Sequence, residues 1–429
     1  MNLVGGKILA AEQCGEILEG LSAGILSALF KGAPDSETVI RACDTLVRDL
    51  DTAACAELLA GIGIDGALAK SYISELRRMF SAESLRFRLR TELGESLGAV
   101  TVRTPLFRDF AVEESTRPLG VILHIAAGNA DGLPAFSVLE GLLTGNVNIL
   151  KLPAADGGLS VRLLAELVRI EPALADFIYV FDYSSRDVEQ LRKLIAVADA
   201  VSVWGGDAAV TALRGLVPPN VKLIEWGHKI SFAYASGEIT EEALCGLAEH
   251  IVGTGQLLCS SCQGVWLDTA DTEEINAFCE RFLPILEAAQ AKSPRDFGES
   301  VRYRTALEVY NAELEAFYTD SRVFKGKQCS LIARKDSVPE VAIGFGNLWV
   351  KRLPRAEILS VLRPCKNMLQ TVGLLCGDSK RAALADSFFR AGAVRVCKAS
   401  RMSEVYCGQP HDGEFSLRRF VKIVHSDAD

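Results

Sequence analysis

Apolar residues between residue 9 and about residue 93 recur every three to four positions. The clearest runs are Ile17, Leu21, Ile25 and Leu29, followed by Val39, Cys43, Leu46 and Leu50. This is the spacing at which side chains share one face of an α-helix. The pattern therefore predicts a succession of amphipathic helices, which usually cover a neighbouring sheet or a partner subunit.

The pattern changes to alternation soon after residue 94. Residues 99–103 alternate between apolar and polar positions, Pro105 interrupts them, and residues 107–112 resume the pattern. A period of two is typical of a strand with one exposed face, so residues 99–116 are predicted to form an exposed hairpin arm. Exposed strands tend to pair with another strand, which makes the arm a candidate for dimerisation. Residues 420–424 also alternate and are a candidate partner for the arm.

The clearest architecture begins at residue 121, where β-branched runs alternate with helical segments. Predicted strands occupy residues 121–125, 147–150, 177–181, 200–204 and 222–225. Continuous apolar runs are typical of parallel strands buried on both faces, and parallel neighbours need crossover helices between them. The fold class is therefore α/β, with a doubly wound parallel sheet that binds ligands beyond the carboxyl ends of its strands.

A dinucleotide on this sheet would be held in an unusual way, because the G-x-G-x-x-G pattern is absent. Gly205 and Gly206 follow a predicted strand and open a helix, where backbone N–H groups can bind a pyrophosphate. Lys151 ends another predicted strand, from which its ammonium can reach a ribose or a phosphate. Each feature alone is weak evidence, because glycine and lysine are common at strand ends.

Composition narrows the class of protein. A chain of 429 residues is too long for one ordinary core, so two or three domains are expected. With 49% hydrophobic and 24% charged residues the chain is globular, and its net charge of −9 argues against nucleic acid as a partner. Twelve cysteines without a secretory signal indicate a reducing, cytoplasmic location, and no stretch suggests a membrane span.

The candidate chemistry lies in residues 255–264, an uncharged stretch bounded by glycines that carries Cys259 and Cys262. Small neighbours leave a thiol accessible, and a stabilised thiolate is a nucleophile. Two other interpretations stay open at this point. Both cysteines can be small buried apolar residues, or the Cys-x-x-Cys pair can form a disulfide or bind a metal. No second cysteine or histidine pair lies nearby, which weighs against the metal.

Four motifs in the same order resemble the aldehyde dehydrogenase superfamily. In that family a strand ends in Glu-Leu-Gly-Gly-Lys, and a Gly-Gln-x-Cys nucleophile loop follows a few tens of residues later. Here residues 225–229 are Glu-Trp-Gly-His-Lys, and Cys259 follows 34 residues after Glu225. Residues 118–151 are similar to the family's P-x-G-V…N…G-N-x-x-x-x-K stretch, which matches Asn129 and Lys151. The nucleophile loop departs from the family by one extra leucine before Cys259.

Within that superfamily, the chain most resembles the long-chain acyl-CoA reductases of bacterial luminescence operons, the LuxC type. The marks are Cys259-Ser260-Ser261 followed by Gln263, Trp204-Gly205-Gly206, Arg363-Pro364 followed by Gln370, and His411-Asp412-Gly413. A proline is expected in that family at the position of Cys262. This departure leaves the nucleophile assignment intact and raises the question of what the second thiol does.

The resemblance implies NADPH-dependent reduction of a fatty acyl-CoA thioester to an aldehyde through an acyl-enzyme on Cys259. The resemblance also implies that the side-chain amide of Asn129 and the backbone N–H of Cys259 stabilise the oxyanion that forms on the acyl carbonyl. Glu225 stands where hydrolytic relatives keep a base, and its role stays open between a proton carrier and a structural carboxylate. The residues that the resemblance assigns to the cofactor are Lys151, Trp204, Gly205 and Gly206.

The same resemblance implies an aldehyde dehydrogenase-like division of the chain. The expected parts are 1–98 (helices of the cofactor domain), 99–116 (oligomerisation arm), 117–225 (dinucleotide-binding domain), 226–400 (catalytic thiol domain) and 401–429 (C-terminal return and strand). The expected partners are an acyl-CoA or acylated protein substrate, an acyl-protein synthetase or transferase, and further copies of the chain, without nucleic acid, metal or membrane. Two alternatives are a hydrolytic aldehyde dehydrogenase and a non-catalytic subunit of an acyl-transfer complex. Among the histidines, His228 replaces a glycine of the motif and is the one to test.

Overall fold

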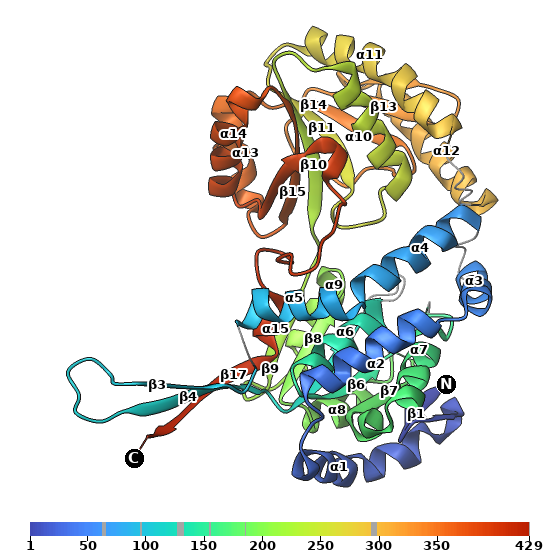
Figure 1. Cartoon of the computed structure of the whole chain (residues 1–429). Helices are drawn as coiled ribbons and strands as arrows, with labels where there is room; N and C mark the ends of the chain where they lie inside the picture. Colours follow the sequence, from blue (N-terminus) through green and yellow to red (C-terminus); the bar gives the residue numbers. More distant parts are fainter. Residues whose placement is uncertain are drawn as a thin grey trace. The chain divides into compact units, whose positions relative to one another are not determined.

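The computed structural model describes residues 1–61, 66–94, 97–126, 133–153, 156–184, 186–292 and 298–428. The chain forms two compact units (Figure 1). Unit 1 consists of Met1–Gly227 and Tyr406–Asp429, and unit 2 consists of His228–Val405. Each unit is built around a seven-stranded sheet of its own.

The sheet of unit 1 has the strand order β2-β1-β7-β6-β5-β8-β9. Its parallel strands are β5 (Val121–Ile125), β6 (Val147–Lys151), β7 (Ile178–Phe181), β8 (Ala200–Trp204) and β9 (Lys222–Trp226). The five strands predicted from apolar runs are thus confirmed, each within one residue at either end. Two short strands that were not predicted, β1 (Asn2–Val4) and β2 (Lys7–Leu9), extend the sheet beside β7.

The order of the strands fixes where the crossover helices lie. The chain runs from β5 through β6 to β7 in one direction and then returns to β8 and β9 on the other side of β5. Right-handed crossovers place α6 (Leu133–Leu143) and α7 (Leu159–Ile170) on one face, and α8 (Val188–Ala196) and α9 (Asp207–Arg214) on the other. The direction reverses between β5 and β8, and in doubly wound sheets the ligand crevice opens at that reversal.

The N-terminal segment is helical, as the spacing of its apolar residues predicts. Its helices are α1 (Cys14–Lys31), α2 (Ser36–Asp49), α3 (Thr52–Gly61), α4 (Gly66–Met79) and α5 (Ala82–Leu93). α2 begins where the Asp35 carboxylate accepts the N–H of Thr38 at 2.7 Å, which satisfies one of the free donors of the first turn. α2 packs against α6 and α7, so this segment covers the sheet of unit 1.

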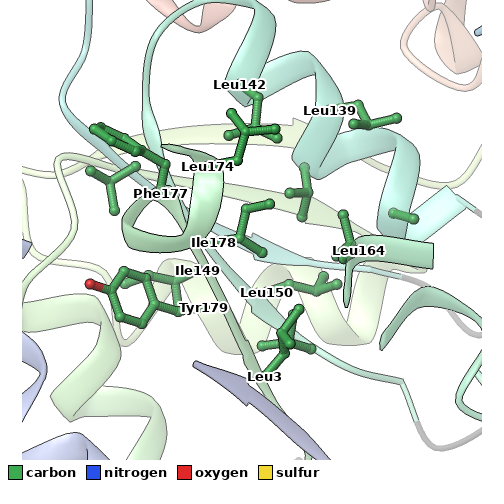
Figure 2. Close-up of a cluster of buried hydrophobic side chains, with 14 of the residues drawn as sticks. Leu3, Leu139, Leu142, Ile149, Leu150, Leu164, Leu174, Phe177, Ile178 and Tyr179 are labelled. Atoms are coloured by element: carbon green, nitrogen blue, oxygen red, sulfur yellow. The ribbon is translucent and has the colours of Figure 1, made fainter. Parts of the chain in front are cut away.

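The core of unit 1 lies between this helical layer and the sheet. Figure 2 shows Leu150 of β6 and Ile178 of β7 on the side of Leu142 in α6 and Leu164 in α7, whereas Ile149 of β6 points to the opposite face of the sheet. Each of these five side chains is almost wholly buried. Because burying one such side chain contributes roughly 1.5–3 kcal/mol, the strands are held by their side chains on both faces.

The C-terminal segment returns to unit 1 and is fastened by a buried ion-pair network. The Arg88 guanidinium donates to Glu92 at 2.6 Å and also to Glu140. Glu92 accepts the backbone N–H of Leu417 at 2.9 Å, and the Ser416 hydroxyl donates to Glu140 at 3.0 Å. α15 (Ser416–Arg419) is thereby tied to α5 and α6. Removing one member would leave a buried charge without its partner, which typically costs about 3–5 kcal/mol.

A three-stranded ribbon projects from unit 1 (Figure 1), in the order β17-β4-β3. It consists of β3 (Val100–Arg103), β4 (Val112–Pro118) and β17 (Val421–Asp427). The second strand begins at residue 112 and not at residue 107 as predicted, because Pro105 and the positive φ of Phe107 (63°) turn the chain first. β17 pairs with β4, so the C-terminal strand joins the arm. Leu106 and Phe107 at its tip are exposed.

The sheet of unit 2 has the order β12-β13-β14-β11-β10-β15-β16. Its strands are β10 (Ile230–Ser236), β11 (Cys262–Leu267), β12 (Arg322–Lys325), β13 (Ser330–Arg334), β14 (Asn347–Arg352), β15 (Leu369–Cys376) and β16 (Arg395–Lys398). All neighbours are parallel except β12, which is antiparallel to β13. The helices of unit 2 are α10 (Glu241–Thr254), α11 (Thr272–Ala291), α12 (Glu299–Glu315), α13 (Ile358–Leu362) and α14 (Asp378–Ala391). In the part of the chain that the structure describes, no helix has both the length and the apolar character of a membrane span.

Candidate active site

The predicted nucleophile lies in a tight loop of unit 2, which we define as the thiol loop (residues 255–261). α10 ends at Thr254, Gly255 follows with a φ of 57°, and Gln256 also has a positive φ of 63°. Two left-handed residues in succession reverse the chain toward the sheet, and β11 begins at Cys262. Cys259 lies within this reversal and is exposed. The loop therefore presents the thiol at the amino end of a buried strand.

Ser231 in β10 holds the backbone of Cys259 by a hydrogen bond. The buried Ser231 hydroxyl donates to the carbonyl of Cys259 at 2.7 Å and accepts the N–H of Thr371 in β15 at 3.0 Å. A local turn adds the N–H of Leu258, which donates to the Ser261 hydroxyl at 3.0 Å. One buried hydroxyl thus links the thiol loop to two strands. Sequence analysis missed Ser231, because it lies 28 residues before Cys259 and carries no motif.

Two glutamines clamp the thiol loop. The buried Gln256 side chain donates to the carbonyl of Cys262 at 3.0 Å and accepts the N–H of Gly346 at 2.9 Å. The side chain of Gln263 donates to the carbonyl of Gln256 at 3.2 Å and accepts the N–H of Ala342 at 3.1 Å. Each amide satisfies backbone groups that the loop and its neighbouring turn leave unpaired. This explains physically why glutamine, with a donor and an acceptor in one side chain, suits both positions.

The Gln256→Met variant should slow acylation of Cys259 by about 100-fold, since displacing a reacting group by 1 Å can cost that much. Methionine has a similar length but leaves the Cys262 carbonyl and the Gly346 N–H without their partner. Stopped-flow measurement of acylation checks this. Gln13→Met is the matched control, because Gln13 makes a comparable hydrogen bond to Ala10 on an exposed surface. Equal acylation rates in the two variants would show that the clamp does not position the thiol.

The second cysteine of the pair is a buried structural residue. Cys262 is fully buried, its Sγ contacts the Gly264 carbonyl at 3.2 Å, and burial raises its pKa to about 12. Its backbone N–H donates to Nε2 of His250 at 3.2 Å. Burial lowers the pKa of His250 to about 4, so this imidazole is neutral near pH 7 and can accept that bond. The two thiols therefore differ in accessibility, and Cys259 is the one that a substrate can approach.

No metal ligand set accompanies the cysteine pair. Among the described residues, no group of three or more His, Cys, Asp or Glu side chains is arranged to hold a metal ion. The Cys262 thiol is also turned into the core of unit 2.

The predicted cofactor residues of unit 1 lie at the carboxyl ends of β6 and β8, the two strands that flank β5. Lys151 is in register with Ile125, Ile125 with Val203, and Val203 with Glu225. These four residues form one row across β6, β5, β8 and β9. Partners in a parallel ladder point to the same face, so Lys151 and Glu225 share the face of α8 and α9. The row also crosses the reversal between β5 and β8.

Lys151 is a largely buried cation at this edge. Burial lowers the pKa of its ammonium, while the nearby Asp182 carboxylate opposes that effect. Its Nζ lies 5.9 Å from the centre of the Tyr183 ring. A lysine at the carboxyl end of a strand, beside the reversal of the sheet, can donate to a bound ribose or phosphate.

Gly205 and Gly206 form the turn from β8 to α9. Gly206 is the N-cap of α9, with an extended φ of −72°. A Cβ built on Gly206 would meet no atom within 4 Å. The side of Gly206 is therefore open at the start of α9, and the N–H groups of a helix start can bind a phosphate group.

Glu225 is bound to Arg214, the last residue of α9. The guanidinium donates to both carboxylate oxygens, and the Nη2–Oε2 distance is 2.5 Å. The Glu225 carboxylate accordingly raises the pKa of Arg214. A bidentate pair of this kind is one of the stronger contacts that a carboxylate makes. Glu225 therefore has a structural partner on α9, and a further role as a proton carrier stays open.

Trp204 faces the other side of the sheet from Lys151 and Glu225. Its ring stacks on Trp226 with a centroid distance of 5.0 Å, and His411 contacts both rings at 4.9 and 5.2 Å. The three rings form a cluster that ties the C-terminal segment to β8 and β9. Sequence analysis grouped Trp204 with the cofactor residues, but the structure does not bring its side chain together with them.

Two further residues singled out from the sequence are Asn129 and His228. Asn129, the predicted oxyanion donor, lies outside the described residues. His228 is the first residue of unit 2 and is exposed between β9 and β10. The predicted thiol thus belongs to unit 2, and Lys151, Trp204, Gly205, Gly206 and Glu225 belong to unit 1.

Two doubly wound sheets, one carrying an exposed thiol before a strand, define an aldehyde dehydrogenase fold. The structure superposes on a putative methylmalonate-semialdehyde dehydrogenase from Sinorhizobium meliloti 1021 complexed with NAD, with a TM-score of 0.75, 14% identity and coverage of 100% of this chain and 97% of that one. Aldehyde dehydrogenase 21 from Physcomitrella patens gives a TM-score of 0.73 at 13% identity, covering 96% and 90%. Within this fold, the chain belongs to the family described as Acyl-CoA reductase (LuxC), which matches residues 33–423.

Curated relatives are similar to this chain over most of its length. A long-chain acyl-protein thioester reductase from Aliivibrio fischeri is 25% identical over 323 residues, and long-chain acyl-protein thioester reductase 2 from Photobacterium leiognathi is 24% identical over 320 residues. Each alignment covers 72% of this chain and 64% of the relative. The chain therefore spans somewhat less than two thirds of the length of these relatives.

Proposed function

We propose that this protein reduces a long-chain acyl thioester to the aldehyde through an acyl-enzyme on Cys259, with NADPH as the reductant. The observation that carries the proposal is the exposed thiol of Cys259, held by Ser231 and Gln256 at the amino end of β11. Membership of the acyl-CoA reductase (LuxC) family supports a thioester as the substrate. The relatives named above are thioester reductases, which supports the direction of the reaction.

The proposed reaction has two stages. The Cys259 thiolate attacks the thioester carbonyl, a new C–S bond forms, the bond to the carrier sulfur breaks, and the carrier thiolate takes a proton from water. NADPH, when bound, would supply the hydride that reduces the acyl carbon. The thiohemiacetal oxyanion on Cys259 then collapses: its C–S bond breaks, the aldehyde leaves, and the thiolate is restored. In both stages, the backbone N–H of Cys259 and the side-chain amide of Asn129 stabilise the oxyanion; losing one such donor typically costs about 100- to 1000-fold in rate.

Unit 1 has groups that fit a phosphorylated dinucleotide. The start of α9 is open at the Cβ position of Gly206, and helix starts bind phosphate groups. In the common dinucleotide fold, an acidic residue after the second strand of the sheet binds the ribose 2′-hydroxyl of NAD. Here that strand is β6, and it ends at Lys151. Asp156, further along the chain, is engaged by the Ser160 hydroxyl at 2.5 Å. A cation in place of the carboxylate favours the 2′-phosphate of NADP.

The Lys151→Met variant should weaken binding of NADPH by at least tenfold and binding of NADH much less. Methionine keeps the apolar stem in its buried position and removes the charge that would meet the 2′-phosphate. Fluorescence titration with both nucleotides gives the ratio directly. An equal loss for NADPH and NADH would place Lys151 at a group that the two cofactors share.

The Gly206→Val variant should raise the dissociation constant of NADPH by at least tenfold and leave acylation of Cys259 unchanged. The added side chain meets no protein atom at its Cβ and needs no unusual φ, so it should crowd only a ligand at the helix start. Gly20→Val on α1, whose added Cβ also meets no atom, is the matched control. An unchanged cofactor affinity in Gly206→Val would place the phosphates elsewhere.

The thioester that donates the acyl group can be an acyl-CoA or an acylated protein. The relatives are named for acyl-protein thioesters, and the family is named for acyl-CoA. We propose that this chain accepts an acyl group from either carrier, and that a separate acyl-protein synthetase or transferase supplies it. Mixing the protein and NADPH with acyl-CoA, and separately with an acylated carrier protein, tests this by the loss of nicotinamide absorbance. The absence of NADPH oxidation with both donors would overturn the proposed function.

A further inference from the structure

The helix α12 of unit 2 carries apolar side chains on two opposite faces. The inner face contributes Thr305, Val309 and Ala312, which are buried in unit 2. The outer face carries a row that we define as the α12 seam: Tyr303, Leu307, Tyr310, Leu314 and Phe317, the last in the turn after the helix. A helix that is apolar on both faces needs a partner on each.

The spacing of the α12 seam is that of a helix–helix contact. Its members follow one another at intervals of four, three, four and three residues, which is the a/d repeat of coiled coils. Together with Tyr318, their exposed fractions range from 43% to 92%. Since an aromatic side chain buries roughly 150–250 Å², the seam offers on the order of 700 Å². One side of a standard protein interface buries about 800 Å², so the seam is large enough for a stable contact.

The α12 seam is complementary to itself in the antiparallel direction. When two copies of the helix cross at Tyr310, Tyr303 of one faces Phe317 of the other, and Leu307 faces Leu314. A two-fold axis through Tyr310 produces both contacts twice, which is the arrangement of an isologous interface. Aromatic and leucine side chains then oppose one another along the whole seam.

The charges beside the seam fit the same arrangement. Arg304 and Glu315 lie on the same flank of the seam, at nearly equal distances along the helix from Tyr310 on either side. An antiparallel two-fold pair brings this flank of one copy next to the same flank of the other. Arg304 of each copy then meets Glu315 of its neighbour. Glu315 is also 3.7 Å from Arg334 of its own chain and stays 61% exposed, so it can accept a second cation.

We propose that α12 forms an interface between two copies of this chain, the helices packing antiparallel about a two-fold axis at Tyr310. The proposal is independent of the proposed catalytic function, because it uses no residue of the thiol loop or of the cofactor edge. It commits to a second copy as the occupant, since the seam and its flanking charges match themselves.

The first test is the mass of the protein in solution. Leu307→Glu and Leu314→Glu should each halve the mass measured by light scattering at the same protein concentration, because each places a charge in the middle of the seam. Phe389→Glu on α14, also exposed, is the matched control and should leave the mass unchanged. A wild-type protein that is monomeric, or a mass that both leucine variants leave unchanged, would overturn the proposal, including the case in which a different protein covers this face.

The second test fixes the direction of the helices. Tyr310→Cys should form a disulfide with its own copy under mild oxidation, and a mixture of Tyr303→Cys with Phe317→Cys should cross-link between the two variants. Peptide mapping by mass spectrometry identifies the bond among the native cysteines. A Tyr303→Cys protein that cross-links to itself would indicate parallel helices and contradict the proposal.

The third test uses the flanking charges. Arg304→Glu alone should lower the fraction of dimer, and adding Glu315→Arg to the same chain should restore it. A double variant that stays as weak as Arg304→Glu would contradict the antiparallel pairing of these two residues.

Discussion

Replacing Cys259 with alanine should abolish both acylation and NADPH oxidation. Removing the nucleophile of an enzyme that works through a covalent intermediate can cost on the order of a millionfold in rate, so turnover should fall to background. Steady-state NADPH oxidation with saturating acyl thioester measures the loss. Cofactor affinity should be unchanged, because the groups assigned to NADPH all lie in unit 1.

Cys262→Ala is the matched control for Cys259→Ala. It removes a thiol three positions away in sequence that is fully buried and has a pKa of about 12. We expect a loss of about 1 kcal/mol in the free energy of unfolding, the typical effect of a core truncation of this size, with most activity retained. Activity that is lost in Cys262→Ala and kept in Cys259→Ala would reverse the assignment of the nucleophile.

Replacing Glu225 with glutamine should slow hydrolysis of the trapped acyl-enzyme far more than it slows NADPH oxidation. Activation of water by a general base is typically worth about 100- to 10,000-fold, whereas hydride delivery needs no activated water. The amide keeps the size of the carboxylate, so packing is preserved. Single-turnover rates of hydrolysis and of NADPH oxidation in the same variant give the comparison.

The ion pair with Arg214 supplies the control for Glu225→Gln. Arg214 is a mostly exposed residue whose guanidinium occupies both oxygens of Glu225. Arg214→Leu frees the carboxylate while keeping it, so acyl-enzyme hydrolysis should rise or stay the same. NADPH oxidation that collapses in Glu225→Gln as much as hydrolysis does would make Glu225 part of the reductive proton path.

Much of the fold could be predicted because its signals are local. The strands β5 to β9 are short runs of branched apolar residues, and such runs are buried between two helical layers whatever the rest of the chain does. The N-terminal helices follow from spacing alone. The small strands β1 and β2 were missed, because three residues are too few to show a period.

The candidate site was predictable only where a residue carries its own signal. Cys259 stands out by its small, uncharged neighbours. Its anchor Ser231 comes from β10, the Thr371 backbone group from β15, and the Gly346 backbone group from the turn before β14. Their proximity follows from strand order, which sequence spacing does not reveal.

The contacts of Trp204 and Glu225 could likewise not be predicted from their neighbours in sequence. Strand alternation places Trp204 opposite the face of Lys151, so its nearness in sequence to Gly205 did not bring its ring to the cofactor edge. The partner of Glu225 is Arg214, in the preceding helix. That Glu225 pairs with Arg214 depends on how α9 packs on the sheet and not on any local sequence pattern.

The central claim is that Cys259 carries the acyl group during reduction. The most direct measurement is an intact-mass and peptide-map analysis of the wild-type protein mixed with a long-chain acyl thioester, before and after NADPH is added. The account predicts one added acyl group per chain on the peptide that holds Cys259, its loss on addition of NADPH, and release of the matching aldehyde. An acyl group on another residue, or an adduct that NADPH leaves in place, would contradict it.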